Sequence, residues 1–111
     1  MATALIVSLN FNPGHASHLI ASYKQCEEIG YESYYYVHPD FIEYLPKNSR
    51  VCVYGKDDIP KAEVAFFLFP SQKNLKLIRN LKRCNTKVIY VFNEPFAALK
   101  EYVRHDSIFF I

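Results

Sequence analysis

Glycine, methionine and tryptophan are scarce in this sequence: three glycines, one methionine and no tryptophan among 111 residues. The three glycines do not form a Gly-x-Gly-x-x-Gly fingerprint, so binding of NAD or FAD is not expected. Neither the P-loop spacing nor a Ser/His/Asp pattern typical of a catalytic triad occurs. The common dinucleotide and P-loop motifs are therefore excluded, and no cofactor is expected.

Cysteine is also sparse, and its spacing excludes the usual metal motifs. Cys26, Cys52 and Cys84 are far apart in the sequence, and no two of them have metal-ligand spacing. Each lies in an apolar segment, which predicts three reduced, mostly buried thiols in a cytoplasmic protein. No metal site is expected.

Long hydrophobic runs are missing as well. The first apolar run spans residues 4–9, and no basic segment precedes it as in a secretory signal. No stretch approaches the roughly 20 apolar residues that a membrane-spanning helix needs. We therefore expect a cytoplasmic protein that does not cross a membrane.

Charge is nearly balanced overall but unevenly distributed. The formal net charge of +2 does not by itself indicate nucleic acid, and no nucleic-acid partner is expected. Six basic residues with no acid between them occupy a short stretch: Lys73, Lys76, Arg79, Lys82, Arg83 and Lys87. This run is either the solvated face of a helix or a contact surface for an anionic partner, such as a membrane surface or a lipid-linked acceptor.

Hydrophobic residues make up half of the chain, with nine tyrosines and nine phenylalanines. This composition and length predict one globular domain over residues 1–111. Short apolar runs that read as strands cover residues 4–9, 31–37, 50–54, 63–69, 86–92 and 107–111. Amphipathic helices are predicted after the first, fourth and fifth runs, and a single helical turn over residues 41–45.

The first strand and helix give the clearest signal. The strand is followed by a break at residues 10–14 and then by a helix with Ala16, Leu19, Ile20, Tyr23 and Cys26 at helical spacing. Gly30 is expected to end this helix, Gly55 the third strand and Asn85 the later helix. Asn12 and Pro13 suit the N-cap and first helical position.

Alternating strands and helices, with continuously apolar inner strands, predict an α/β fold. We expect a three-layer, Rossmann-like, doubly wound parallel sheet in the order 3-2-1-4-5, with residues 108–111 as a possible sixth strand beside the fifth. The residues expected to be buried are Ile6, Val7, Val64, Phe66, Leu68, Val88 and Ile89. Because an apolar run ends the sequence, we also expect this chain to be the N-terminal piece of a longer, two-domain protein.

Polar residues follow the carboxyl ends of several predicted strands, where ligands bind in open α/β sheets. Those after the first strand are Asn10, Gly14, His15 and His18, and those after the fourth and fifth are Ser71, Asn93 and Glu94. In a functional interpretation, the N–H groups of Gly14 and His15 face a phosphate or a sugar hydroxyl. The simpler alternative is an ordinary strand-to-helix turn with one surface and one half-buried histidine, Ser71 as a cap and Glu94 favouring the start of its helix.

Three short segments resemble one family. Gly14 and His18 match a Gly-x-x-x-His spacing at the start of the first helix, and Gly30-Tyr31-Glu32-Ser33 matches its exit. Residues 92–95, Phe-Asn-Glu-Pro, resemble a His-Glu-Pro-type loop with asparagine in place of histidine. Together they resemble the N-terminal domain of bacterial GT-B-type, group 1-like glycosyltransferases, although many members have a glycine pair where this chain has Gly14 alone.

The resemblance implies half of an enzyme. In that family the N-terminal domain mostly binds the sugar acceptor, and the C-terminal domain holds the nucleotide-sugar donor. The implied activity is sugar transfer to a glycan or lipid-linked acceptor in envelope polysaccharide synthesis, at the inner face of the membrane. The alternative is a non-catalytic, flavodoxin-like or ligand-binding module. Its receiver form is disfavoured, because Asn10 and Gly55 stand where a receiver has acidic residues.

Overall fold

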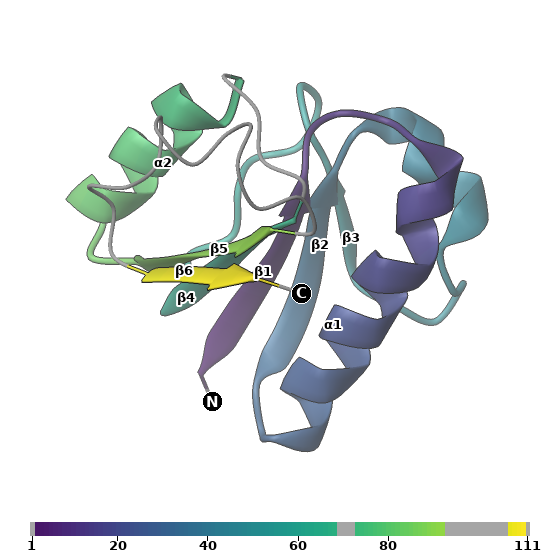
Figure 1. Cartoon of the computed structure of the whole chain (residues 1–111), viewed down its shortest axis with the longest axis horizontal. Coiled ribbons are helices and arrows are strands. Elements are labelled where there is room, and N and C mark those ends of the chain that lie inside the picture. Colours follow the sequence, from purple (N-terminus) through teal and green to yellow (C-terminus); the bar gives the residue numbers. More distant parts are fainter. Residues whose placement is uncertain (1, 69–72, 93–106, 111) are drawn as a thin grey trace.

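The computed structural model describes residues 2–68, 73–92 and 107–110, which form a parallel sheet with helices on it (Figure 1). The strands are β1 (Thr3–Ser8), β2 (Glu32–Val37), β3 (Val51–Val53), β4 (Val64–Leu68), β5 (Lys87–Phe92) and β6 (Ser107–Phe110). The helices within these ranges are α1 (Ala16–Glu28), α2 (Lys73–Arg83) and the 3-10 helices η1 (Pro13–His15) and η2 (Pro39–Tyr44).

The strand order is β3-β2-β1-β4-β5-β6, and every pairing is parallel. β1 lies in the middle, where Ile6 is aligned with Tyr35 of β2 on one side and with Phe66 of β4 on the other. The segment between β3 and β4 contains no helix. The predicted Rossmann-like α/β fold and the order 3-2-1-4-5 are confirmed, and β6 pairs with β5 as predicted.

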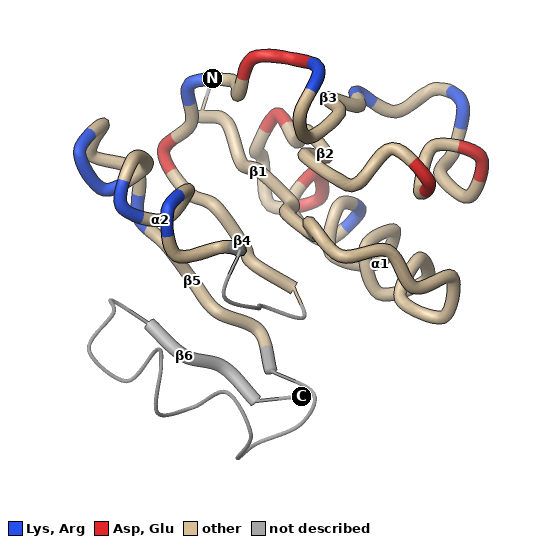
Figure 2. Tube along the Cα trace, turned by 90° about the horizontal axis from the view of Figure 1, so that it is seen from above, with Lys and Arg blue, Asp and Glu red and all other residues tan. Residues whose placement is uncertain are grey.

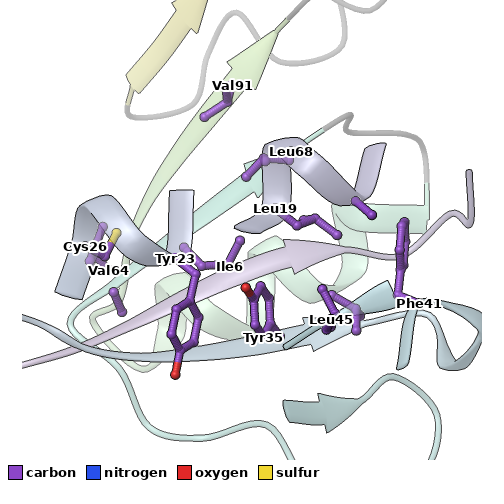
Figure 3. Close-up of a cluster of buried hydrophobic side chains, with 13 residues drawn as sticks. Ile6, Leu19, Tyr23, Cys26, Tyr35, Phe41, Leu45, Val64, Leu68 and Val91 are labelled. Atoms are coloured by element: carbon purple, nitrogen blue, oxygen red, sulfur yellow. The ribbon is translucent and has the colours of Figure 1, made fainter. Parts of the chain in front are cut away.

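Successive residues of β1 point to opposite faces of the sheet, and each face has its own core. Ile6 packs in a cluster with residues of α1 such as Leu19 and Tyr23 (Figure 3). Leu5 and Val7 belong to a second cluster that contains residues of α2. The two helices therefore cover opposite faces, which explains why the central strands are apolar at nearly every position.

Two residues expected in the core are only partly buried. Phe66 and Ile89 lie in β4 and β5 and pack at the margin of the cluster under α1, whereas the other five expected residues are buried. Among the described elements, α1 packs mainly on β1 and β2. Helix α1 therefore covers β4 and β5 less completely than β1 and β2. The apolar sequences of β4 and β5 do not predict this difference.

The predicted helix and strand ends are confirmed by backbone geometry. Gly30 follows α1 with φ of 102°, and Gly55 follows β3 with φ of 85°. Asn85 has φ of 63° after α2, a left-handed conformation that asparagine tolerates better than most residues. These three residues let the chain reverse direction between elements.

The expectation of mostly buried thiols is correct for Cys26 alone. Cys26 is buried under α1, and burial raises the pKa of its thiol. Cys52 is half-buried because it lies in the edge strand β3, and Cys84 is exposed because it follows the last residue of α2. All three cysteines are free thiols.

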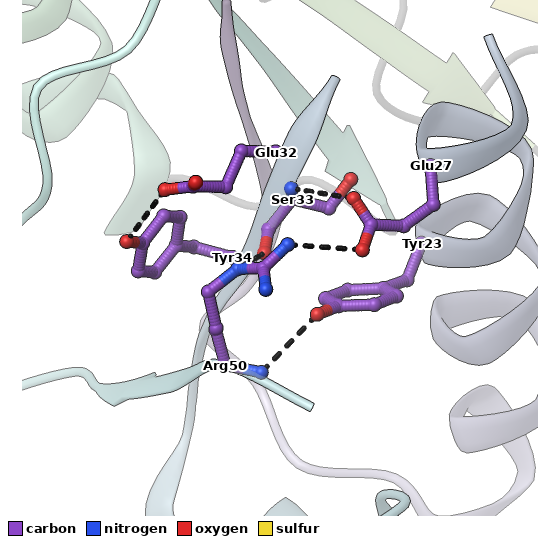
Figure 4. A network of polar contacts seen from close by, with 6 residues as sticks. All are labelled: Tyr23, Glu27, Glu32, Ser33, Tyr34 and Arg50. Carbon is purple, nitrogen blue, oxygen red and sulfur yellow. Dashed lines mark hydrogen bonds and ion pairs between the residues drawn. The ribbon is translucent and has the colours of Figure 1, made fainter. Parts of the chain in front are cut away.

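A polar network fastens the edge strand β3 to the rest of the fold (Figure 4). The Arg50 guanidinium forms an ion pair with Glu27 of α1 at 2.9 Å and donates through Nε to the Ser33 carbonyl at 3.0 Å. The Arg50 backbone N–H donates to the Tyr23 hydroxyl at 3.2 Å. One residue before β3 thus links α1 and β2, which positions the short strand at the edge of the sheet.

Tyr35 makes the stability of the fold sensitive to alkaline pH. Its ring stacks on Tyr23 with centroids 4.4 Å apart, and its fully buried hydroxyl has no hydrogen-bond partner within the described part of the chain. Burial, followed by the neighbouring Tyr23, raises the pKa of Tyr35 far above its usual value of about 10. In the unfolded chain this phenol ionises near that usual value, while the folded protein keeps the proton.

We therefore expect stability to be retained below about pH 10 and lost above it, at up to about 1.4 kcal/mol per pH unit from this group. Tyr35→Phe should leave the free energy of unfolding at pH 7 unchanged or slightly higher, because it removes an unsatisfied hydroxyl. The same variant should flatten the alkaline decline. Urea denaturation of both proteins between neutral and alkaline pH measures this, and parallel declines would contradict it.

Candidate functional site

The candidate site lies at the carboxyl edge of the sheet, where β1 and β2 end and their connecting segments begin (Figure 1). Because all strands are parallel, the residues that follow them meet at this one edge. Asn10, which is half-buried, comes directly after β1 and Leu9. The polar residues predicted after β1 therefore lie where open α/β sheets bind ligands.

The turn after β1 is built around Asn12, which caps η1 as predicted. Asn12 has extended backbone angles, φ of −151° and ψ of 118°, and Pro13 occupies the first helical position. The Asn12 Oδ1 atom accepts a hydrogen bond from the Gly14 N–H at 2.9 Å, and the His15 N–H donates to the Asn12 carbonyl at 2.9 Å. Of the two interpretations left open, the one in which these N–H groups face a ligand is contradicted, because the turn itself uses both; the structure shows the ordinary strand-to-helix turn.

The two histidines of this region lie in different environments. His15 is half-buried immediately before α1, and His18 is exposed one turn later. This arrangement matches the simpler alternative of one half-buried and one surface histidine. Among residues 2–68, 73–92 and 107–110, no three metal-binding side chains come together.

The turn after β2 contributes residues that the predicted site did not include. His38 follows β2 and caps η2, and its Nδ1 atom accepts a hydrogen bond from the Asp40 N–H at 3.1 Å. The neutral imidazole therefore carries its proton on Nε2, which makes that nitrogen a donor. The sequence signal was present, since His38 follows a predicted strand just as Asn10 does.

Aromatic rings join the two turns. The Phe11 ring lies 6.0 Å from the His38 ring, 5.0 Å from Phe41 in an edge-to-face contact, and 5.7 Å from Tyr44. Phe41 is fully buried, whereas Tyr44 is 43% exposed and its neighbour Ile42 is 50% exposed. The edge thus presents an aromatic surface next to amide and imidazole groups.

The combination of an aromatic surface with amide and imidazole groups suits a sugar better than a simple anion. A sugar ring offers hydroxyl groups for polar contacts and an apolar C–H face that packs on aromatic side chains, as in mostly apolar sites with a few placed polar groups. The polar residues of these two turns include Asn10, Asn12, His38 and Asp40. Neither lysine nor arginine occurs between Asn10 and Lys24.

Three of the predicted site residues lie outside the described residues: Ser71, Asn93 and Glu94. The geometry of the candidate site is therefore given by the turns after β1 and β2. Asn10 and the cap residue Asn12 lie at the edge together with Gly14 and His15.

Comparisons of the chain with protein-family models, curated proteins and solved structures found no match. In the part of the chain that the structure describes, no helix has the length and apolar character needed to cross a membrane.

Proposed function

We propose that this chain is the acceptor-side N-terminal domain of a GT-B-type glycosyltransferase. The observation that carries the proposal is the pairing of an aromatic surface with amide and imidazole groups at the carboxyl edge of a Rossmann-like sheet. The resemblance at Gly14, His18 and residues 30–33 supports the same assignment. The reaction would transfer a sugar from a nucleotide-sugar to a glycan or lipid-linked acceptor of an envelope polysaccharide.

In this proposal the edge binds and orients the acceptor. Asn10 and His38 would hydrogen-bond acceptor hydroxyls, while Phe11 and Tyr44 would pack against its apolar face. Gly14 would allow close approach, and His15, His18, Ser71, Asn93 and Glu94 would complete the lining. The donor would bind mainly to a second domain, so no catalytic residue is assigned to this chain and no cofactor is required. The enzyme would work in the cytoplasm, at the inner face of the membrane.

A non-catalytic, ligand-binding α/β module is the second candidate. It is favoured by the turn after β1, whose Gly14 and His15 N–H groups are both occupied by Asn12. The hydrogen bonds remove the two backbone donors that the sugar-transfer interpretation had placed against a phosphate or a sugar hydroxyl. The two candidates differ in what the edge recognises and in whether sugar transfer depends on it.

Binding experiments on the 111-residue chain test the proposal. Calorimetry with a panel of nucleotide-sugars should show no binding tighter than about 1 mM, because most donor contacts belong to the other domain. Titration with oligosaccharides, followed by NMR, should shift the amide signals of Asn10, Phe11 and His38 more than those of residues at the amino ends of the strands. Micromolar donor binding, or oligosaccharide shifts confined to other surfaces, would contradict the acceptor-side assignment.

A further inference from the structure

Helix α2 presents a solvent face made of cations. Lys76, Arg79 and Arg83 are exposed and follow one another at intervals of three and four residues, which places them on one side of the helix. Ile78 and Leu81 are buried in the core on the opposite side. We refer to Lys76, Arg79 and Arg83 as the α2 cationic surface. Figure 2 shows basic residues gathered along this helix.

The sequence around this helix contains no acidic residue. The stretch 73–87 contains six of the thirteen basic residues and no acidic residue, so the remaining seven basic and eleven acidic residues leave the rest of the chain at −4. Within the described ranges, the ion pair of a carboxylate with a lysine or arginine joins Glu27 to Arg50 and does not involve the α2 cationic surface. Among the described residues outside this stretch, five basic and eight acidic residues give −3, so positive charge in the described part of the chain is concentrated at α2.

We propose that the α2 cationic surface docks the protein on an anionic lipid bilayer. The apolar side of α2 is packed in the core, so the helix lies on the headgroups without inserting. Attraction to anionic lipid contributes at each cation near the surface, and the excess of acidic residues among the other described residues orients the molecule with α2 toward the bilayer.

A bilayer fits this surface better than a single-stranded nucleic acid does. Single-stranded nucleic acids are bound by cations interleaved with aromatic side chains that stack on bases. Helix α2 has no aromatic residue, and the exposed residue between Arg79 and Lys82 is Asn80. A row of cations without stacking groups matches a plane of phosphate headgroups.

The choice of a membrane as the anionic partner rests on the proposed function. The charge pattern of α2 is an observation that is independent of that proposal. Helix α2 follows β4, so it begins on the carboxyl side of the sheet, where the candidate site lies. Docking through α2 would therefore keep the acceptor edge close to a bilayer that carries a lipid-linked acceptor.

Vesicle co-sedimentation of the 111-residue chain tests the proposal. The probes are phosphatidylcholine vesicles with and without phosphatidylglycerol, at about 0.1 M and about 1 M salt. The test variant Lys76→Gln/Arg79→Gln/Arg83→Gln is compared with Lys24→Gln/Lys47→Gln/Lys56→Gln, which removes three exposed cations elsewhere and gives the same net charge. Circular dichroism checks that both fold.

We expect binding only to the anionic vesicles and loss of that binding at high salt. The test variant should bind about 100-fold more weakly, given the usual contribution of each cation near an anionic surface, and the control variant should bind nearly as well as the parent. Equal losses in both variants, equal binding to neutral vesicles, or no binding to either kind would overturn the proposal, as would tighter binding to single-stranded RNA than to the vesicles. No sugar is present, so failure here is separate from failure of the acceptor-side assignment.

Discussion

Replacing Phe67 by alanine is expected to lower the free energy of unfolding by about 3–5 kcal/mol. Phe67 lies in β4, is 0% exposed, and packs with its ring centroid 6.2 Å from that of Tyr90 in β5. It also aligns with Val7 of the central strand. Truncation would remove the buried ring and leave a cavity between the sheet and α2, and urea denaturation would measure the loss.

Phe66→Ala is the matched control, because the neighbouring residue faces the other side of the same strand. Phe66 is partly exposed, so less apolar area returns to water and about half the loss is expected. Phe67→Leu should cost under about 2 kcal/mol, since it preserves most of the packing. Equal losses at Phe66 and Phe67 would mean that the two faces of β4 are covered equally, and a loss under about 1 kcal/mol at Phe67 would mean that β4 is not covered by α2 as described.

The order of the sheet was predictable because each buried parallel strand leaves a strong mark in the sequence. β1 and β4 lie between other strands and under helices, so nearly every residue in them is apolar. Gly30, Gly55 and Asn85 marked the ends of elements because few other residues accept positive φ. These signals are local, and together they specify the alternation of strands and helices.

The exposure of Phe66 and Ile89 was not predictable from the same signals. Both residues lie in apolar strands, but their burial depends on how far α1 extends across the sheet. That distance follows from the packing of Leu19 and Tyr23 on β1 and β2, which is a tertiary property. Strand sequence therefore predicts that a residue faces a core, and the position of the helix decides how completely it is covered.

In the candidate site, too, the local feature was predictable from the sequence and the tertiary contacts were not. Asn12 was expected to cap the helix, and a capping side chain necessarily occupies an N–H group of the first turn. The cap and a free Gly14 N–H are therefore mutually exclusive alternatives, and the structure supports the cap. The meeting of Phe11 with Phe41 and Tyr44 depends on η2 folding back toward the first turn, which periodicity does not encode.

Sugar transfer by the two-domain protein proposed above should fall at least about 100-fold when Gly14 is replaced by valine. A Cβ atom at Gly14 would lie 3.3 Å from Asn12 Oδ1, close enough to press on the cap. The branched side chain would also cover the exposed turn through which the acceptor is expected to approach. Misplacing a reactant by about 1 Å is enough for a loss of this size. Steady-state assays of purified variants measure it, with thermal unfolding to confirm the fold.

Two further variants separate occlusion from a general loss of stability. Ala21→Val places the same side chain on an exposed position of α1, so it should lower stability slightly and leave transfer unchanged. Asn12→Asp keeps an oxygen that accepts the Gly14 N–H, so it should retain the cap and leave both stability and transfer close to those of the parent. Unchanged sugar transfer in Gly14→Val would mean that the turn after β1 is not part of the acceptor site. Equal losses in Gly14→Val and Ala21→Val would assign the effect to folding, because the second variant leaves the carboxyl edge untouched.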